Sequence, residues 1–523
     1  MNLLSAIFLV PLLAAVLIVP IPRTIRWGIR LVALMATFVS MVLGLALFVK
    51  FDAATAVNGF KFDYMTDWVS LPGIGLTIAY HVGVDGINLG LVVMGTIVAF
   101  AATCLSKEID RFEKEYYILL LIMIGGILGA FVSLDIFFLY FFHELALVPT
   151  FIMIGIWGRG PDRNHATFKI TLYLSLGALI ALAGLVMLYL QSGLKTFDLV
   201  ALTGHFQAHP MGEASQRLIF PLLMFGFGIL VSLWPFHTWA PTGYAHAPTA
   251  TAMLHAGVLK KFGLYGLLRI AIPMMPAGAA EWLGVLALLC LGNILYCGLV
   301  AMKQRDLNFL IGNSSVAHVG FIFLGIASLS LVGVTGAVVL MIAHGFLAAL
   351  TFGLSGWLRQ QTGTTEIAKF GGLLRQLPFV GTFLMIAMMA GCGLPGFGNF
   401  VGEFMVLFGS WQAYPVITGI AIWSALVIGG VYMLRAIRDV LHGQMDEQWK
   451  SLRDADVFRR VPVVILTVSL LLMGIFPRLL TDKIKPDVAR IVASTKTGGM
   501  AKPTPSSPTK PVVNSHEVPK AHH

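Results

Sequence analysis

Stretches of about 20 apolar residues recur from one end of this 523-residue chain to the other. A stretch of that length spans the roughly 30 Å hydrocarbon core of a bilayer as an α-helix, because each helical residue adds about 1.5 Å. Hydrophobic residues make up 57% of the chain and charged residues only 11%, which excludes a soluble globular protein. Transmembrane β-strands are about half as long, so the pattern predicts an all-α polytopic membrane protein.

Fourteen transmembrane spans are predicted. The first is kept as a helix because its basic residues Arg23, Arg26 and Arg30 follow the apolar run, whereas those of a secretory signal precede it. The polar segment 482 to 523 has too little apolar surface to pack and is predicted to be a flexible tail. The predicted spans cover residues 2 to 21, 31 to 49, 83 to 105, 116 to 132, 134 to 157, 168 to 191, 217 to 236, 248 to 271, 283 to 302, 309 to 329, 331 to 357, 378 to 408, 413 to 441 and 461 to 476.

Lysine and arginine are concentrated in the loops that follow odd-numbered spans, for example Arg111 after the third and Arg163 after the fifth. The loops after even-numbered spans hold little beyond Lys195 and Arg217. Since cytoplasmic loops carry this excess, both termini are predicted to face the periplasmic side of a bacterial inner membrane. The same loops account for the formal net charge of +10, which argues against nucleic acid as a partner.

Two of the spans contain helix-breaking residues. Pro235 interrupts the seventh span, and Gly393, Pro395 and Gly396 interrupt the twelfth. Interrupted backbone is tolerated in a bilayer only where it is buried in protein or lines water, and two breaks five helices apart indicate a repeat. Helices one to three (1–115) are therefore predicted to precede two inverted five-helix repeats, spans four to eight (116–271) and nine to thirteen (283–441).

Ionisable side chains inside the apolar spans are few. A charge at the bilayer centre costs at least about 2.5 kcal/mol, so the adjacent Lys260 and Lys261 indicate a proton or ion pathway. Each of the others has a structural alternative, such as a protonated core carboxyl for Glu144, a neutral core imidazole for the central histidines, or a helix cap for Asp135. The other ionisable residues in the spans are Asp135, His143, Glu144, His237, His255, His318, His344 and Glu403.

The sequence offers no motif for redox chemistry or metal binding. The glycine-rich run GLPGFGNF follows no strand, so it does not fit a dinucleotide-binding or phosphate-binding loop. The four cysteines Cys104, Cys290, Cys297 and Cys392 lack metal-ligand spacing and are predicted to be small core residues. We therefore expect no metal and no cofactor in this chain.

Several runs are typical of one membrane-protein family. FHELALVP (142–149), KKFGLYGLLR (260–269), SSVAHVGFIFLGI (314–326), MIAHGF (341–346) and GLPGFGNFVGEFMVLFGSW (393–411) resemble the antiporter-like M-type subunits of proton-pumping NADH:quinone oxidoreductase, respiratory complex I. The resemblance implies fourteen helices with two inverted repeats and breaks in helices seven and twelve. It also implies that this chain couples quinone reduction to proton pumping without redox chemistry of its own.

Carried over residue by residue, the resemblance gives each central ionisable group a role. Glu144 resembles the glutamate of the family's ion pair, and Lys261 resembles its central lysine. His318 and His344 resemble the polar relay, and Glu403 resembles the terminal proton site. The sibling antiporter-like subunits generally have lysine at that last position, so Glu403 favours the M type.

One position departs from the family pattern. The lysine that usually pairs with the span-five glutamate is replaced by Ser232, whereas Lys260 occupies a position that is usually apolar and His255 is an added polar group. We hypothesise that Lys260, or else His237 or His255, supplies the positive charge that Glu144 lacks. A nitrogen-to-oxygen contact within about 4 Å would support this hypothesis.

The resemblance also implies what lies around the chain. Its partners would be the lipid bilayer and the other membrane subunits of complex I, especially sibling antiporter-like subunits, and flavin, iron–sulfur clusters and quinone would belong to other subunits. Three alternatives stay open: a subunit of a multisubunit cation/proton antiporter, a subunit of a membrane-bound hydrogenase, and a structural scaffold that does not pump. Glu403 argues against the first, and Ser232 raises the third.

Overall fold

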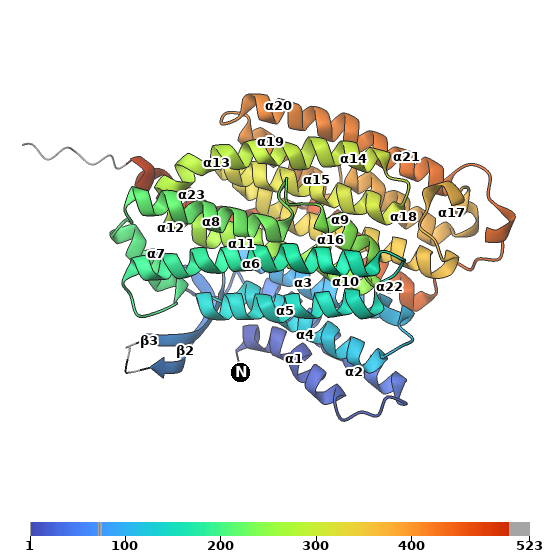
Figure 1. The fold of residues 1–523 in the computed structure, drawn as a ribbon, viewed down its shortest axis with the longest axis horizontal. Coiled ribbons are helices and arrows are strands. Elements are labelled where there is room, and N and C mark those ends of the chain that lie inside the picture. Colours follow the sequence, from blue (N-terminus) through green and yellow to red (C-terminus); the bar gives the residue numbers. More distant parts are fainter. Residues whose placement is uncertain (1, 72, 74–75, 501–523) are drawn as a thin grey trace, which may run out of the picture.

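The computed structural model describes residues 2–71, 73 and 76–500. Long helices run side by side in one bundle, with their axes close to the long axis of the molecule (Figure 1). Helices of the first half are α1 (Leu3–Ile18), α2 (Arg26–Lys50), α3 (Gly86–Leu105), α4 (Glu113–Val132), α5 (Ile136–Trp157), α6 (Arg163–Ser192), α7 (Leu199–Ala208), α8 (Glu213–Val231), α9 (Trp239–His246), α10 (Thr249–Leu254), α11 (Lys261–Gly266) and α12 (Ile272–Met274).

The second half continues the same bundle, and α18 and α19 are its two parts of the interrupted twelfth span. Helices of this half are α13 (Pro276–Leu291), α14 (Cys297–Lys303), α15 (Leu307–Ala327), α16 (Leu331–Thr362), α17 (Leu373–Gln376), α18 (Pro378–Gly391), α19 (Gly398–Ser410), α20 (Pro415–Trp423), α21 (Gly430–Leu441), α22 (Val457–Ile475) and α23 (Arg478–Met500). Four π-helical turns connect helix segments, namely η2 (His255–Leu259), η3 (Leu267–Ala271), η4 (Gly292–Tyr296) and η6 (Ser424–Gly429).

The predicted helical membrane fold is confirmed. In the part of the chain that the structure describes, eleven helices are long and apolar enough to cross a membrane. Breaks, π turns and short helices divide other predicted spans, such as the eighth, into segments below that length. The count of fourteen spans and the inverted relation of the two repeats stay predictions.

A β-hairpin that the sequence analysis did not anticipate lies between α2 and α3. Strands β1 (Ala56–Val57), β2 (Phe60–Leu71) and β3 (Leu76–Val84) pair antiparallel in the order β1-β2-β3. The hairpin projects from the same end of the bundle as α7 (Figure 1). A hydrogen bond from the Thr77 amide to the Lys195 carbonyl, 3.1 Å long, joins it to the segment before α7.

Loops of the two predicted classes lie at opposite ends of the bundle. At one end, Glu108 forms an ion pair with Arg159 and accepts hydrogen bonds from the amide and hydroxyl of Thr249, both 2.7 Å long. Arg359 donates a hydrogen bond of 2.9 Å to the Ala245 carbonyl nearby. The hairpin and the loop after α6 meet at the other end. The separation of odd and even loops fits the predicted topology, and which end faces the cytoplasm stays a prediction.

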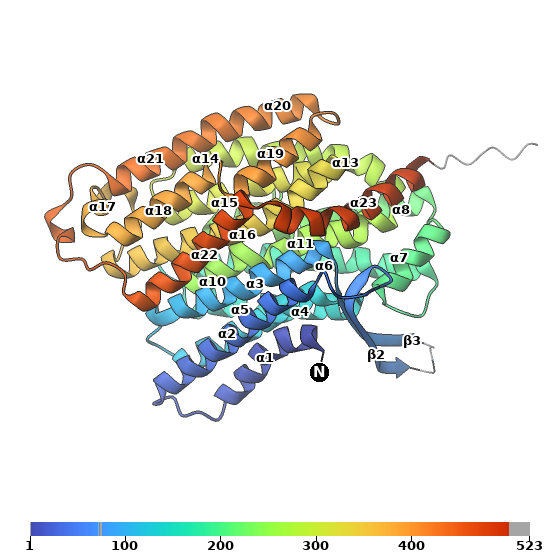
Figure 2. The same ribbon diagram turned by 180° about the vertical axis from the view of Figure 1, so that it is seen from behind.

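The prediction of a flexible tail from residue 482 is wrong as far as residue 500. Helix α23 lies across the bundle and packs against α3, α12, α13 and α16 (Figure 2). Ile484, Val488 and Ile491 are buried, and their i, i+4, i+7 spacing forms one apolar helix face that the low overall hydrophobicity concealed. Asp487 accepts a 2.5 Å hydrogen bond from the Gly86 amide at the start of α3. Residues 501–523 lie outside the described part.

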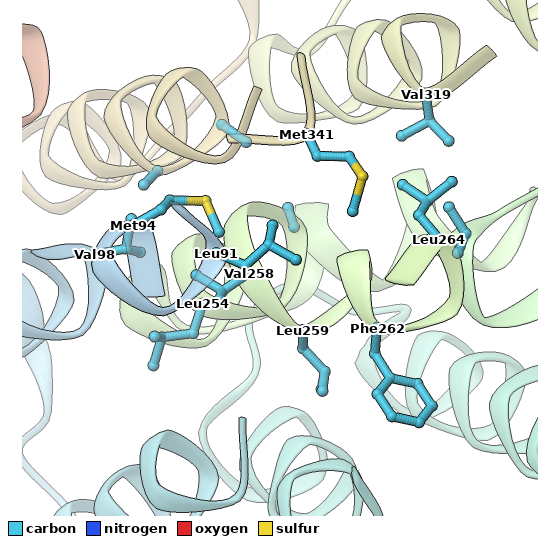
Figure 3. Close-up of a cluster of buried hydrophobic side chains, with 14 of the residues drawn as sticks. Leu91, Met94, Val98, Leu254, Val258, Leu259, Phe262, Leu264, Val319 and Met341 are labelled. Atoms are coloured by element: carbon cyan, nitrogen blue, oxygen red, sulfur yellow. The ribbon is translucent and has the colours of Figure 1, made fainter. Parts of the chain in front are cut away.

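The segment from α10 to α11 lies in the apolar centre of the bundle. Leu91, Met94 and Val98 of α3 approach it from one side, and Val319 of α15 and Met341 of α16 from another (Figure 3). The lysines of this segment are therefore held within close-packed hydrocarbon, where only a few polar neighbours can reach them.

Candidate functional site

The two adjacent lysines lie at a π turn. The turn η2 ends at Leu259, and Lys260 and Lys261 follow it, with 1% and 0% of their surfaces exposed. A π turn inserts one extra residue into the helix, and such turns are frequent at functional sites. The two ammonium groups consequently reach different neighbours, since Lys260 contacts α15 and Lys261 contacts α16.

Lys261 and His344 form the most direct polar contact of the site. The Lys261 Nζ lies 2.8 Å from His344 Nδ1 and donates a second hydrogen bond, 2.7 Å long, to the Ala256 carbonyl. A charged ammonium can only donate, so His344 Nδ1 must be the acceptor when Lys261 is protonated. A proton that moves along this contact leaves a neutral amine and a protonated imidazole.

The next titratable group beyond His344 in space is His318, and the centroids of the two rings are 5.8 Å apart. His318 Nδ1 lies 2.7 Å from the Ser314 carbonyl and Nε2 lies 2.9 Å from the Gly391 carbonyl. A carbonyl oxygen only accepts, so both contacts are hydrogen bonds only when both ring nitrogens carry a proton. A neutral His318 therefore makes only one of these two hydrogen bonds, and gain of a proton completes the second.

The break between α18 and α19 brings Gly391 and Glu403 to His318. The Gly391 carbonyl has no helical donor four residues on, because Pro395 lacks an N–H, and it accepts from His318 instead. Glu403 is buried, and its Oε1 lies 3.6 Å from His318 Nε2. A cavity of about 20 Å³, lined by His318, Glu403 and Tyr432 among others, has room for one water molecule between them.

Glu144 lies apart from this line. Its side chain is 34% exposed, and its nearest basic neighbour is His143, whose Nδ1 lies 3.5 Å from Glu144 Oε1. Among the described residues no ion pair joins Glu144 to Lys260, His255 or His237. The hypothesis that one of these three supplies the missing charge is therefore wrong.

The three side chains proposed as partners of Glu144 have other neighbours. Lys260 donates to Ser315 Oγ at 2.9 Å, and His255 Nδ1 lies 3.2 Å from the hydroxyl of Tyr244. The ring of His237 packs edge-on against Tyr296, with centroids 5.8 Å apart. The sequence does not determine these directions, because the π turn changes which face of the helix each residue occupies.

The break between α8 and α9 is held by a neutral side chain. Ser232 has a left-handed backbone conformation with φ of 77°, and its carbonyl accepts a 2.8 Å hydrogen bond from Asn293 Nδ2. Asn293 Oδ1 accepts a second, also 2.8 Å, from the Trp234 amide. Sequence reasoning missed Asn293, and the only signal for it was an amide side chain in an otherwise apolar span.

Several other predicted positions have structural roles. Asp135 caps α5 by accepting hydrogen bonds from the amides of Phe137 and Phe138, which confirms the capping alternative. Cys290 and Cys297 are fully buried, as expected for core residues, whereas Cys104 and Cys392 are only partly buried. Within the described ranges no group of His, Cys, Asp or Glu side chains has the arrangement of a metal site.

The chain is similar to proteins of respiratory membrane complexes. Residues 133–429 match the family described as NADH:quinone oxidoreductase/Mrp antiporter, transmembrane. NADH-quinone oxidoreductase subunit M of Rhodobacter capsulatus is 34% identical over 511 residues, which is 94% of this chain and 96% of that protein. F(420)H(2) dehydrogenase subunit M of Methanosarcina mazei is 33% identical, over 91% of this chain and 95% of that one.

Solved structures give the same result at the level of the fold. A chain of respiratory complex I from Thermus thermophilus with bound NADH superposes with a TM-score of 0.84 and 27% identity, covering 95% of this chain and all of that one. A chain of the Mrp complex from Dietzia sp. has a TM-score of 0.80 at 18% identity, covering 95% of this chain and 99% of that one. The second likeness concerns the fold alone.

Proposed function

The chain belongs to the NADH:quinone oxidoreductase/Mrp antiporter family as an antiporter-like subunit of the M type, and we propose that it carries protons along Lys261, His344, His318 and Glu403. The observation that carries this proposal is the 2.8 Å contact between Lys261 Nζ and His344 Nδ1 inside the apolar centre of the bundle. A buried lysine paired with a titratable acceptor instead of a carboxylate is suited to giving up its proton.

The transfer begins when the charge near Lys261 changes. A proton leaves Lys261 Nζ for His344 Nδ1, and His344 passes one on from its other nitrogen towards His318. His318 Nε2 lies 3.6 Å from Glu403 Oε1, beyond hydrogen-bond length, so the proton passes between them through a water in the adjoining cavity. Each step breaks one N–H or O–H bond as another forms, so this chain needs no redox group.

Glu403 provides the exit. It also lines a larger apolar cavity of about 320 Å³ on the outer side of α19 and α20, together with Phe404, Phe408 and Trp411. Glu144 lies outside the line, at the far side of α5, and acts as the charge that responds to a neighbouring subunit. The energy arrives from neighbours, which hold the flavin, the iron–sulfur clusters and the quinone.

Membership of the family also indicates the membrane and the neighbours of this chain. The chain is a multi-pass membrane subunit of a respiratory complex, and we place it in a bacterial inner membrane beside sibling antiporter-like subunits, with both termini on the periplasmic side. Exposed apolar side chains of α19 and α20, among them Phe404, Phe408 and Trp423, suit lipid or a neighbouring helix.

A second candidate concerns the electron donor. The relative named F(420)H(2) dehydrogenase subunit M is nearly as similar as the NADH-quinone oxidoreductase relatives, so the same proton line could serve a complex with that donor. Purification of the intact complex through this chain distinguishes the two. We expect an NADH-oxidising flavin subunit in the purified complex, and an F(420)H(2)-oxidising subunit would support the second candidate.

The proposal is tested with Lys261→Ala and Glu403→Gln in the assembled complex, reconstituted into proteoliposomes. Proton uptake driven by the electron donor is measured beside quinone reduction. Both variants are expected to lower the ratio of protons to electrons by the share of protons that passes through this subunit, because each removes an essential proton carrier. An unchanged ratio would support a structural scaffold instead.

A further inference from the structure

Lys260 is a buried charge that the proton line does not use. Its Nζ donates to Ser315 Oγ at 2.9 Å and lies 3.5 Å from the Ser315 carbonyl and 5.8 Å from the centre of the Tyr244 ring. Among the described residues no carboxylate forms an ion pair with it. A buried structural lysine is normally paired with a carboxylate, because an unpaired buried charge costs several kcal/mol. A neutral hydroxyl partner instead suits a group that exchanges its proton.

Polar groups continue from Ser315 to His318. The neighbouring Ser314 Oγ lies 3.3 Å from His318 Nδ1 and 3.0 Å from the hydroxyl of Tyr432. Tyr432 and His318 both line the one-water cavity at Glu403. Lys260 therefore reaches the same end point as Lys261, although it does so along α15 and not through His344 on α16.

Polar groups also lead from Lys260 towards α5. Tyr244, under the Lys260 ammonium, shares a 3.2 Å hydrogen bond with His255 Nδ1. His255 Nε2 is buried and has no hydrogen-bond partner in the described part of the chain. The π turn that begins at His255 packs against α5, and the His143 ring of α5 stacks at 4.0 Å on Phe262, just after this turn. His143 Nδ1 is buried and makes no hydrogen bond among the described residues, and it lies 3.5 Å from Glu144 Oε1.

We propose that His255, Tyr244, Lys260 and Ser315 form a second proton thread, which joins the Glu144 end of the subunit to His318 and replaces the connection that Ser232 cannot make. In each step the donor loses an N–H or O–H bond as the next atom gains one, and water fills the intervals longer than a hydrogen bond. His255 Nε2, which has no hydrogen-bond partner among the described residues, is the end of the thread that such a water joins to the His143 and Glu144 pair. This inference rests on the proposed function and adds proton-carrying residues to it.

The test removes single groups from the thread in the assembled complex in proteoliposomes, with the ratio of protons to electrons as the readout. Lys260→Leu is expected to lower the ratio by up to the loss that Lys261→Ala causes, because a proton-transfer group is removed. Ser315→Ala and Tyr244→Phe each remove only a hydroxyl and are expected to lower it by a smaller amount. These two variants keep the test valid if Lys260→Leu fails to assemble. Thr335→Val is the matched control, because its buried hydroxyl bonds only to its own helix at the Leu331 carbonyl.

A side chain of matched length separates proton transfer from packing. Lys260→Met keeps an unbranched chain of similar length but carries no proton, so it is expected to lower the ratio as Lys260→Leu does, whereas a packing defect would be repaired. An unchanged ratio in Lys260→Leu, Ser315→Ala and Tyr244→Phe overturns the thread, and so does a parental ratio in Lys260→Met. Full pumping in Lys261→Ala would contradict the proposed function itself. Full pumping in the thread variants, together with a loss in Lys261→Ala, would contradict the second thread alone.

Discussion

Each of the two helix breaks leaves a backbone carbonyl without its helical donor, and a different kind of side chain supplies the hydrogen bond. Between α8 and α9 the freed Ser232 carbonyl accepts from the neutral amide of Asn293 at 2.8 Å. Between α18 and α19 the freed Gly391 carbonyl accepts from His318 Nε2 at 2.9 Å. A freed carbonyl inside a bilayer needs a donor in both cases, and the identity of that donor decides whether the break is an anchor or part of a proton line.

The side chains around the two breaks also differ in whether they can carry charge. Glu403 lies close to the second break with His318, and His344 and Lys261 continue inward from there. The first break carries the neutral Ser232, and Glu144 on α5 has no basic partner other than His143 among the described residues. The comparison teaches that titratable groups gather at one break and neutral groups at the other, while both backbones are interrupted.

The largest expected effect comes from the donor at the second break. His318→Leu removes the group between His344 and Glu403 and leaves two carbonyls without a donor. We expect the ratio of protons to electrons in proteoliposomes to fall to the value of the Lys261→Ala variant, because the same line is interrupted. If the ratio stayed at the parental value, the second break would be an anchor like the first.

A smaller effect is expected when the break itself is repaired. Pro395→Ala supplies an N–H that competes with His318 for the Gly391 carbonyl, so we expect the proton-to-electron ratio to fall, but by less than in His318→Leu, since the imidazole is still present. Pro378→Ala is the matched control, because Pro378 is at the first position of α18 where no carbonyl is freed. Equal ratios in the two variants would contradict the role of the Pro395 break.

Asn293→Leu tests the first break through stability. The change leaves the Ser232 carbonyl and the Trp234 amide without partners, and we expect it to lower the free energy of unfolding by about 3 kcal/mol. Unfolding is followed in detergent with increasing denaturant, and the proton-to-electron ratio of the molecules that assemble should stay within about twofold of the parent. Asn399→Leu near the second break is the control, because the Asn399 amide has no hydrogen-bond partner in the described part.

The smallest effect concerns the β-hairpin, outside the membrane-spanning helices. His81 bonds to Asp63 at 2.7 Å and to Asp198 at the start of α7. Burial lowers the pKa of His81, but its bonds to Asp198 and Asp63 outweigh burial and raise it above its ordinary value. The stabilisation is therefore fully present below pH about 6.5, the ordinary pKa of histidine, and is lost as pH rises through the raised pKa.

Hydrogen exchange along β2 and β3 measures this effect. Protection factors should fall from pH 6 to higher pH in the parent protein, because the deprotonated imidazole bonds less strongly to the two carboxylates. His81→Asn should show no such change, because it removes the titrating group. A fall that persists in His81→Asn would show that another group controls the docking of the hairpin.

The sequence predicted the elements whose cause is local. Apolar runs long enough to cross a bilayer indicated the helices, and the residues that cannot continue a helix, Pro235 and Pro395, indicated both breaks. The cost of burying charge identified Lys261 and Glu403. The β-hairpin and the packing of α23 were missed, because their apolar faces are short and lie within polar sequence.

Partner choice was decided only in the tertiary structure. The sequence placed Lys260 in the membrane, and the hypothesis based on it paired that lysine with Glu144, whereas the folded chain directs Lys260 to Ser315. The π turn before the lysines sets the direction of each side chain, and the packing of α15, α16 and α5 around them determines which polar atoms come within reach. Composition and spacing fix how deeply a charge is buried, but hydrogen bonds act over about 3 Å, so only the packed helices determine where its proton can go.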